Sequence, residues 1–491
     1  MAKQFLIGDQ WRDGAKTFES VYPADGGVSA EIACANERDV DDAVRAASAA
    51  MTNPAWRDLP AHRRARLLDN MARLIERDSA HLADLQTRDN GKPLAESEAQ
   101  AAAAADFFRY YAGLCESSEG GVVPPRGPYF GFVDWEPVGV VAAVTPWNSP
   151  LTLEAQKLAP ALAAGNAVVL KSSEITPQVG LEYGRLALEA GFPAGVLNVV
   201  TGLGDVGRAL VSHPDVAMIT FTGGTQTGQA IGAIAGRRTM PAILELGGKS
   251  PNIVFADADL DLAVAGALVA IFHNAGQSCL AGSRVFVDRD VYAPFVERFV
   301  AATRALRLGD PYDRQTAVAT VSSFQHRARI EDWLDTAKRD GAEFLCGGGR
   351  PSGAVFERGA YLEPTVLAVS NDMRIAREEI FGPVACVIPF SGDDELVRLA
   401  NDNPFGLAAG VWTEDYRRAL AIGRRISAGT MWINMYKTTA VNMPFGGNKA
   451  SGVGREAGLG GMRTYMTPKS YYLSLERQPG AWPPAATPAT H

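Results

Sequence analysis

The chain has 491 residues, of which 47% are hydrophobic and 21% are charged, and its formal net charge is −8 at pH 7. This mild acidity excludes a surface built to bind DNA or RNA, which would need a basic face. A chain of this length buries a large core without disulfides or metal ions, and it suggests about three domains.

No long apolar segment marks the N-terminus as a signal peptide, and no apolar run approaches the ~18 residues of a membrane span. We therefore expect a cytoplasmic protein with no membrane or nucleic-acid partner.

Helical spacing of apolar residues predicts helices over 40–50, 62–77 and 96–110, followed by an extended segment at 120–137.

From residue 138 strands alternate with helices. The pattern predicts strands at 138–144, 167–171, 196–200 and 218–222, with helices at 153–164, 178–190 and 206–211 and another ending near 234. A second region predicts strands at 252–255 and 284–288 and helices at 260–272, 292–304, 326–340 and 395–401. Such alternation is typical of an α/β fold with parallel sheets. Residues 477–491 are rich in proline and alanine and predict a flexible tail.

Cysteines occur at 34, 115, 279, 346 and 386, an odd number with wide spacing and no CxxC pair. With six histidines in the chain, neither a metal site nor a disulfide framework is indicated, and we expect a reducing compartment. Four of the five are interpreted as small buried apolar residues. Cys279 differs because it closes the segment Gly276-Gln277-Ser278-Cys279.

Two glycine-rich turns follow strands. Residues 202–207 match GxGxxG, but the next strand ends in Phe-Thr-Gly-Gly instead of the acidic residue that a dinucleotide fingerprint needs. Residues 221–228 open a helix whose N–H groups could bind a pyrophosphate, or they are a simple helix entry capped by Thr225. Lys171 and Glu174 end another strand and could bind ribose hydroxyls, or they form a solvated pair.

Three further residues are candidates for chemistry. Cys279 is a candidate nucleophile, although a free thiol needs local activation. Glu245 follows an apolar strand and is either paired structurally or placed to take a proton. Asn148, in Pro146-Trp147-Asn148, carries an amide donor of the kind used in oxyanion holes, but by itself it is an ordinary turn residue.

These segments occur in one order along the chain, together with Glu-Glu-Ile-Phe-Gly-Pro-Val at 378–384 and Pro-Phe-Gly-Gly at 444–447. The set resembles the NAD(P)-dependent aldehyde dehydrogenase superfamily of the hydrolytic, non-CoA-acylating type, up to about residue 475. The resemblance implies that Cys279 is the nucleophile, Glu245 the general base and Asn148 the oxyanion donor. It further implies that Lys157 and Glu456 form a proton relay.

The resemblance also implies an NAD site, with NADP possible. Its residues would be Trp147, Lys171, Ser173, Glu174, Gly204, Phe221, Thr222, Gly223, Gly224, Thr225, Leu246, Glu379 and Phe381. The substrate channel would be lined by Ser149, Leu153, Gln156, Ser278 and Leu280. Because Ser149 and Gln156 replace aromatic residues of members that act on small aldehydes, we expect a bulky or polar aldehyde. A CoA-acylating semialdehyde dehydrogenase and a non-catalytic scaffold protein are the alternatives.

The expected fold is aldehyde dehydrogenase-like. A Rossmann-like cofactor domain would comprise residues 1–118 and 141–247, and an α/β catalytic domain residues 248–445. A small bridging β element would comprise 119–140 and 463–484. Its C-terminal strand could extend the sheet of a second copy, so a homodimer or homotetramer is expected.

Overall fold

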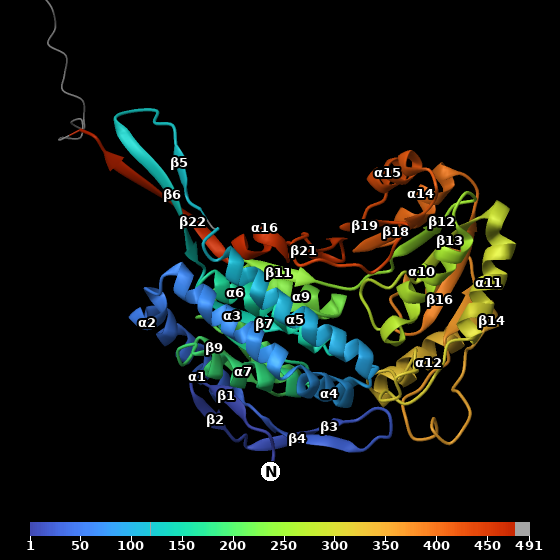
Figure 1. Cartoon of the computed structure of the whole chain (residues 1–491), viewed down its shortest axis with the longest axis horizontal. Helices are drawn as coiled ribbons and strands as arrows, with labels where there is room; N and C mark the ends of the chain where they lie inside the picture. Colours follow the sequence, from blue (N-terminus) through green and yellow to red (C-terminus); the bar gives the residue numbers. More distant parts are fainter. Residues whose placement is uncertain (118, 477–491) are drawn as a thin grey trace, which may run out of the picture.

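The computed structural model describes residues 1–117 and 119–476, so the tail expected at 477–491 lies outside the described residues. The chain forms two α/β lobes and a projecting three-stranded arm (Figure 1). The first lobe is built on an eight-stranded sheet in the order β2 (Gln10–Arg12), β1 (Phe5–Ile7), β9 (Leu197–Val200), β8 (Ala167–Lys171), β7 (Val140–Val144), β10 (Met218–Thr222), β11 (Ala242–Glu245) and β21 (Gly452–Val453). Strands β9, β8, β7, β10 and β11 run parallel.

Helices cover this sheet because each has an apolar stripe that packs on it or on a neighbouring helix. They are α1 (Glu37–Thr52), α2 (Pro54–Arg57), α3 (Ala61–Arg77), α4 (Ser79–Asn90), α5 (Leu94–Leu114), α6 (Pro150–Ala163), α7 (Gln178–Ala190), α8 (Gly204–Ser212), α9 (Thr225–Arg237) and α16 (Gly458–Arg463). One continuous core joins α1, α3, α5, α6 and α7 to the central strands.

The second lobe has its own core and a seven-stranded sheet. Its order is β14 (Glu343–Cys346), β15 (Thr365–Ala368), β16 (Val384–Phe390), β13 (Arg284–Asp288), β12 (Pro251–Val254), β18 (Ala408–Trp412) and β19 (Thr430–Ile433), with β14 alone antiparallel. Its helices are α10 (Leu260–Phe272), α11 (Tyr292–Arg304), α12 (Phe324–Arg339), α13 (Arg374–Arg377), α14 (Asp393–Asn401) and α15 (Tyr416–Arg425). Short 3₁₀ turns occupy His273–Gly276 and Arg289–Val291.

The arm consists of β22 (Met466–Ser474), β6 (Tyr129–Pro137) and β5 (Gly121–Val123), all antiparallel. Figure 1 shows it extending away from both lobes. Two small pairs complete the fold: β3 (Lys16–Val21) with β4 (Val28–Cys34), and β17 (Phe405–Gly406) with β20 (Asn448–Lys449). None of the described helices is long and apolar enough to cross a membrane.

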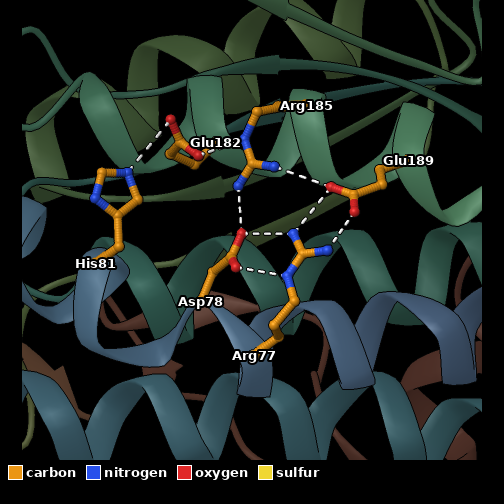
Figure 2. Close-up of polar contacts among 6 residues, drawn as sticks. All are labelled: Arg77, Asp78, His81, Glu182, Arg185 and Glu189. Atoms are coloured by element: carbon orange, nitrogen blue, oxygen red, sulfur yellow. Dashed lines mark hydrogen bonds and ion pairs between the residues drawn. The ribbon is translucent and has the colours of Figure 1, made fainter.

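A network of charged side chains ties α7 to the junction of α3 and α4 (Figure 2). Its members are Arg77, Asp78, His81, Glu182, Arg185 and Glu189. The two arginines hold the pKa of the Asp78 carboxyl well below its ordinary value. Because most of these groups are partly exposed, each pair contributes little to stability.

Candidate active site

The loop that carries Cys279 is held in an unusual backbone conformation. Asn274, Ala275 and Gly276 all adopt left-handed φ values of 57°, 49° and 73°. At Gly276 a Cβ atom would lie 2.0 Å from the carbonyl oxygen of Gly382, so glycine is required both by its φ and by this close approach. The Gly-Gln-Ser-Cys and Phe-Gly-Pro segments therefore pack directly on each other.

Gln277 and Asn274 hold this loop through a set of buried hydrogen bonds. Gln277 Oε1 accepts from the backbone N–H and hydroxyl of Ser322 at 2.8 and 2.7 Å. Asn274 Nδ2 donates to the carbonyls of Asn148 and Gln277 at 3.1 and 3.0 Å. The roles of Asn274 and Ser322 were not predicted from the sequence, and the only signal was the nearby Gln-x-Cys motif.

Asn148 lies beside this loop. Its Nδ2 donates to the Gln277 carbonyl at 3.0 Å, two residues before the Cys279 thiol. An amide nitrogen has two N–H bonds, so one donor remains to meet an oxyanion formed next to Cys279. The structure thus brings together two of the predicted catalytic residues.

Cys279 is half-buried. Burial, with the negative charges of Glu379 and Glu245, raises the pKa of its thiol to about 12. The thiol is therefore neutral at pH 7 and needs a proton acceptor before it can attack. Gly248 packs on the same segment, because a Cβ there would lie 2.6 Å from the Cys279 carbonyl oxygen.

Glu245, the last residue of β11, is a buried carboxyl group. Neither of its oxygens has a hydrogen-bond partner among the described residues. Burial and the charge of Glu456 raise the pKa of Glu245 well above its ordinary value. Gly446 leaves room for the carboxyl, since a Cβ there would lie 2.7 Å from Glu245 Oε1. An unpaired carboxyl with a raised pKa is suited to taking up and releasing a proton during a reaction.

The predicted relay pair forms a fully buried ion pair. Lys157 Nζ donates to Glu456 Oε1 at 2.6 Å, and Gln156 Nε2 donates to Glu456 Oε2 at 2.5 Å. Thr220 and Tyr465, which were not predicted, extend the network through hydrogen bonds of 3.1 Å. The amide of Gln156 is thus bound within the protein, so its substrate role stays a prediction. Ser149, Leu153, Ser278 and Leu280 are half-buried.

The start of α9 offers free donors for an anion. Gly224 is its N-cap, no side chain caps it, and Thr225 is the first helical residue, so the capping role considered for Thr225 is wrong. The hydroxyls of Thr222 and Thr225 are buried without partners in the described part of the chain, and no atom lies within 4 Å of a Cβ placed at Gly224. These features fit the pyrophosphate of a dinucleotide. Gly204 similarly begins α8 with open space above it.

Two other groups flank this region. Lys171 is the last residue of β8, and its Nζ lies 3.2 Å from Glu174 Oε2. Ser173, between them in the sequence, is buried. Glu379 Oε1 accepts from the Gly248 N–H at 3.0 Å, and burial raises the pKa of Glu379 to about 7.

Aromatic residues lie near Glu379. The rings of Trp147 and Phe381 meet edge to face with centroids 5.3 Å apart. His326, which was not predicted, contacts Trp147 and places Nε2 2.7 Å from the Phe381 carbonyl. Because the carbonyl only accepts, His326 donates, and it fixes Phe381 at its left-handed φ of 59°. The predicted Phe221, Gly223 and Leu246 are close to one another at the carboxyl ends of β10 and β11.

Comparison with known proteins agrees with this arrangement. The sequence profile described as the Aldehyde dehydrogenase family matches residues 11–471. The mitochondrial aldehyde dehydrogenase of Equus caballus is 44% identical over 97% of this chain and 96% of its own. The human mitochondrial enzyme is 43% identical over 97% of this chain and 92% of its own.

Solved structures give the same result. Betaine aldehyde dehydrogenase from Staphylococcus aureus, in complex with NAD⁺, superimposes with a TM-score of 0.96 at 36% identity, covering 98% of this chain and 97% of that one. The fold and the site thus define an oxidoreductase that acts on aldehydes. The chain belongs to the aldehyde dehydrogenase family, and the predicted fold class is confirmed.

Proposed function

We propose that this enzyme oxidises an aldehyde to a carboxylic acid with NAD, through a thioester on Cys279 that water hydrolyses. The observation that carries the proposal is the unpaired, buried carboxyl of Glu245 in the site of the Cys279 thiol, whose pKa it raises. A base held this way can take a proton from the water that attacks the thioester.

The chain's own residues stabilise the oxyanion and take the proton from the hydrolytic water. The Cys279 thiol releases its proton to solvent and attacks the aldehyde carbon, while Asn148 and the Cys279 N–H stabilise the oxyanion, an effect of about 3 kcal/mol. A bound NAD would accept the hydride that leaves this carbon. Glu245 then takes a proton from water, which releases the acid, and the Lys157–Glu456 pair passes the proton onward. The test is aldehyde-dependent NADH formation at 340 nm with free acid as product, and a strict requirement for CoA would contradict it.

We propose that residues 1–118 and 141–247 hold the cofactor, with 248–445 supplying the thiol. Lys171 and Glu174 would bind the adenosine ribose, and the start of α9 the pyrophosphate. Glu379 would bind the nicotinamide ribose. The S. aureus neighbour is an NAD⁺ complex. A cytoplasmic location stays a prediction, and the named relatives are mitochondrial enzymes.

Glu174→Gln should raise the ratio of kcat/KM for NADP to that for NAD by about tenfold, because the carboxylate that repels a 2′-phosphate is removed. The side chain is 45% exposed, so the substitution should leave folding unchanged. Glu297→Gln is the control, because it makes the same charge change at an exposed residue of α11. An unchanged cofactor ratio in Glu174→Gln would show that this residue does not face the ribose.

Polar groups at the substrate side favour bulky or hydroxylated aldehydes. Ser149 Oγ accepts hydrogen bonds from Lys92 and Gln100 at 2.9 and 3.1 Å, so a small polar side chain stands where an aromatic ring would narrow the channel. In a kcat/KM panel we expect aromatic and polar aldehydes to exceed short aliphatic ones. Ser149→Phe should shift the preference toward short aldehydes. The reverse order in the unmodified enzyme would refute this expectation.

We also propose a homodimer or a tetramer of dimers. Strand β22 is an edge of the arm, and apolar side chains on the arm are exposed, among them Val122 at 69% and Tyr472 at 72%. An exposed edge strand of this length, with apolar side chains exposed around it, is typically covered by a partner. Light scattering should give at least twice the chain mass of 52.2 kDa, and Tyr472→Asp should lower it. A stable monomer of the unmodified chain would contradict the proposal.

A further inference from the structure

Two lysines that the mechanism does not use lie close to the reacting groups. Lys92, in the turn between α4 and α5, is 1% exposed and donates from Nζ to Ser149 Oγ at 2.9 Å. Lys437, in the loop after β19, places Nζ 3.4 Å from the His273 carbonyl, at the start of the turn that leads to Cys279. The two lysines influence each other's charge, and Lys437 also acts on the Cys279 thiol.

Glu96 offsets this positive charge only in part. Its Oε1 accepts from the Asn274 N–H at 3.2 Å, and its Oε2 lies 3.4 Å from His273 Nε2. Partial burial and the charges of Lys437 and Lys92 lower the pKa of His273, so this ring adds no positive charge. Burial also lowers the pKa of Lys92 to about 7 and of Lys437 to about 8, while the Glu96 carboxylate opposes both shifts. Burial also raises the pKa of Glu96. Two lysines therefore share one carboxylate in this cluster, and a bound anion would favour the charged form of both.

The loop holds Lys437 in a defined place. Its φ is 61°, a left-handed value that is uncommon for a residue with a side chain. The preceding Tyr436 is buried against Gly282 and Gly410, and Trp432 Nε1 donates to the Thr438 carbonyl at 2.7 Å. Lys437 itself is half-buried, and Thr438 and Thr439 beside it are exposed. Residues held in such backbone conformations cluster at active sites and ligand-binding loops.

We propose that Lys437, supported by Lys92, selects aldehydes that carry a carboxylate at the end remote from the aldehyde group. This inference rests on the proposed oxidation at Cys279. The ammonium group would pair with the carboxylate, and Thr438 and Thr439 could donate further hydrogen bonds. The same charge disfavours the quaternary ammonium group of betaine aldehyde, the substrate named for the S. aureus neighbour.

The test compares succinic semialdehyde with its uncharged methyl ester and with betaine aldehyde. The unmodified enzyme should prefer the anion, and Lys437→Gln should lower the anion-to-ester ratio of kcat/KM by about tenfold, mainly through KM of the anion. Lys437→Arg should keep most of the preference, because it keeps the charge. Lys338→Gln on the surface of α12 makes the same change in net charge and should leave the ratio unaltered.

The results separate the role of Lys437 from the proposed oxidation at Cys279. Oxidation of the ester without preference for the anion, or preference for betaine aldehyde, would overturn the role of Lys437 and leave the oxidation at Cys279 intact. An equal loss for anion and ester in Lys437→Gln would also overturn it, because the lysine would then act on the thiol. Absence of NADH formation with all three aldehydes would contradict the proposed function itself.

Discussion

Cys279→Ala should lower aldehyde-dependent NADH formation by roughly 10³-fold or more, because no other described thiol could form the adduct in this site. The side chain is half-buried and small, so the loop should keep its conformation through Gln277, Asn274 and Ser322. The variant should still bind NAD, and quenching of tryptophan fluorescence measures this binding. The measurement is steady-state turnover at saturating NAD and aldehyde.

Cys34→Ala is the matched control, because Cys34 is also a half-buried free thiol and lies in β4 of the first lobe. It should retain activity. Turnover that survives Cys279→Ala would mean that the aldehyde is oxidised without a covalent adduct on this residue. The electrostatic surroundings of Cys279 would then have no catalytic explanation.

Glu245→Gln should lower the steady-state rate by about 10²-fold while still permitting a first turnover, because the amide cannot activate water for deacylation. Stopped-flow absorbance at 340 nm should therefore show a burst of NADH followed by a slow phase. The burst itself reports that the variant is folded and binds both substrates. A steady-state rate equal to that of the unmodified enzyme would exclude Glu245 as the base.

The pH dependence follows from the same carboxyl group. Since burial raises the pKa of Glu245, the group is protonated at acidic pH and becomes a base only as the pH rises through the raised pKa. The deacylation rate should therefore increase with pH, and Glu245→Gln should lose this dependence. The sign would be opposite if Glu245 acted as an acid in the rate-limiting step.

Much of the fold could be predicted from local pattern. The strands β8, β10 and β13 and the helices α7, α10 and α11 have the bounds that apolar periodicity and flanking glycines indicate. The short strands β1 to β4, the helix α4 and the strands β14 to β16, β18 and β19 were not predicted. These segments are short or lack clear periodicity, and their strands form through pairing with distant residues, such as Leu6 with Val199.

The site shows the same division between local and long-range information. Motifs point to Cys279, Glu245 and Asn148, but only the folded chain places Ser322 against Gln277 and His326 against Phe381. The cluster of Lys92, Glu96 and Lys437 joins segments more than 300 residues apart. No pattern within one segment could reveal such a cluster, because each lysine alone is typical of a solvated surface.

The central claim is that the aldehyde becomes a thioester on Cys279 before water releases it. Rapid acid quench of Glu245→Gln after mixing with NAD and benzaldehyde, followed by intact-mass and peptide mass spectrometry, tests it directly. We expect an added benzoyl group on the peptide that contains Cys279, at a level that matches the NADH burst. A burst of NADH with no acyl group on this peptide would contradict the account.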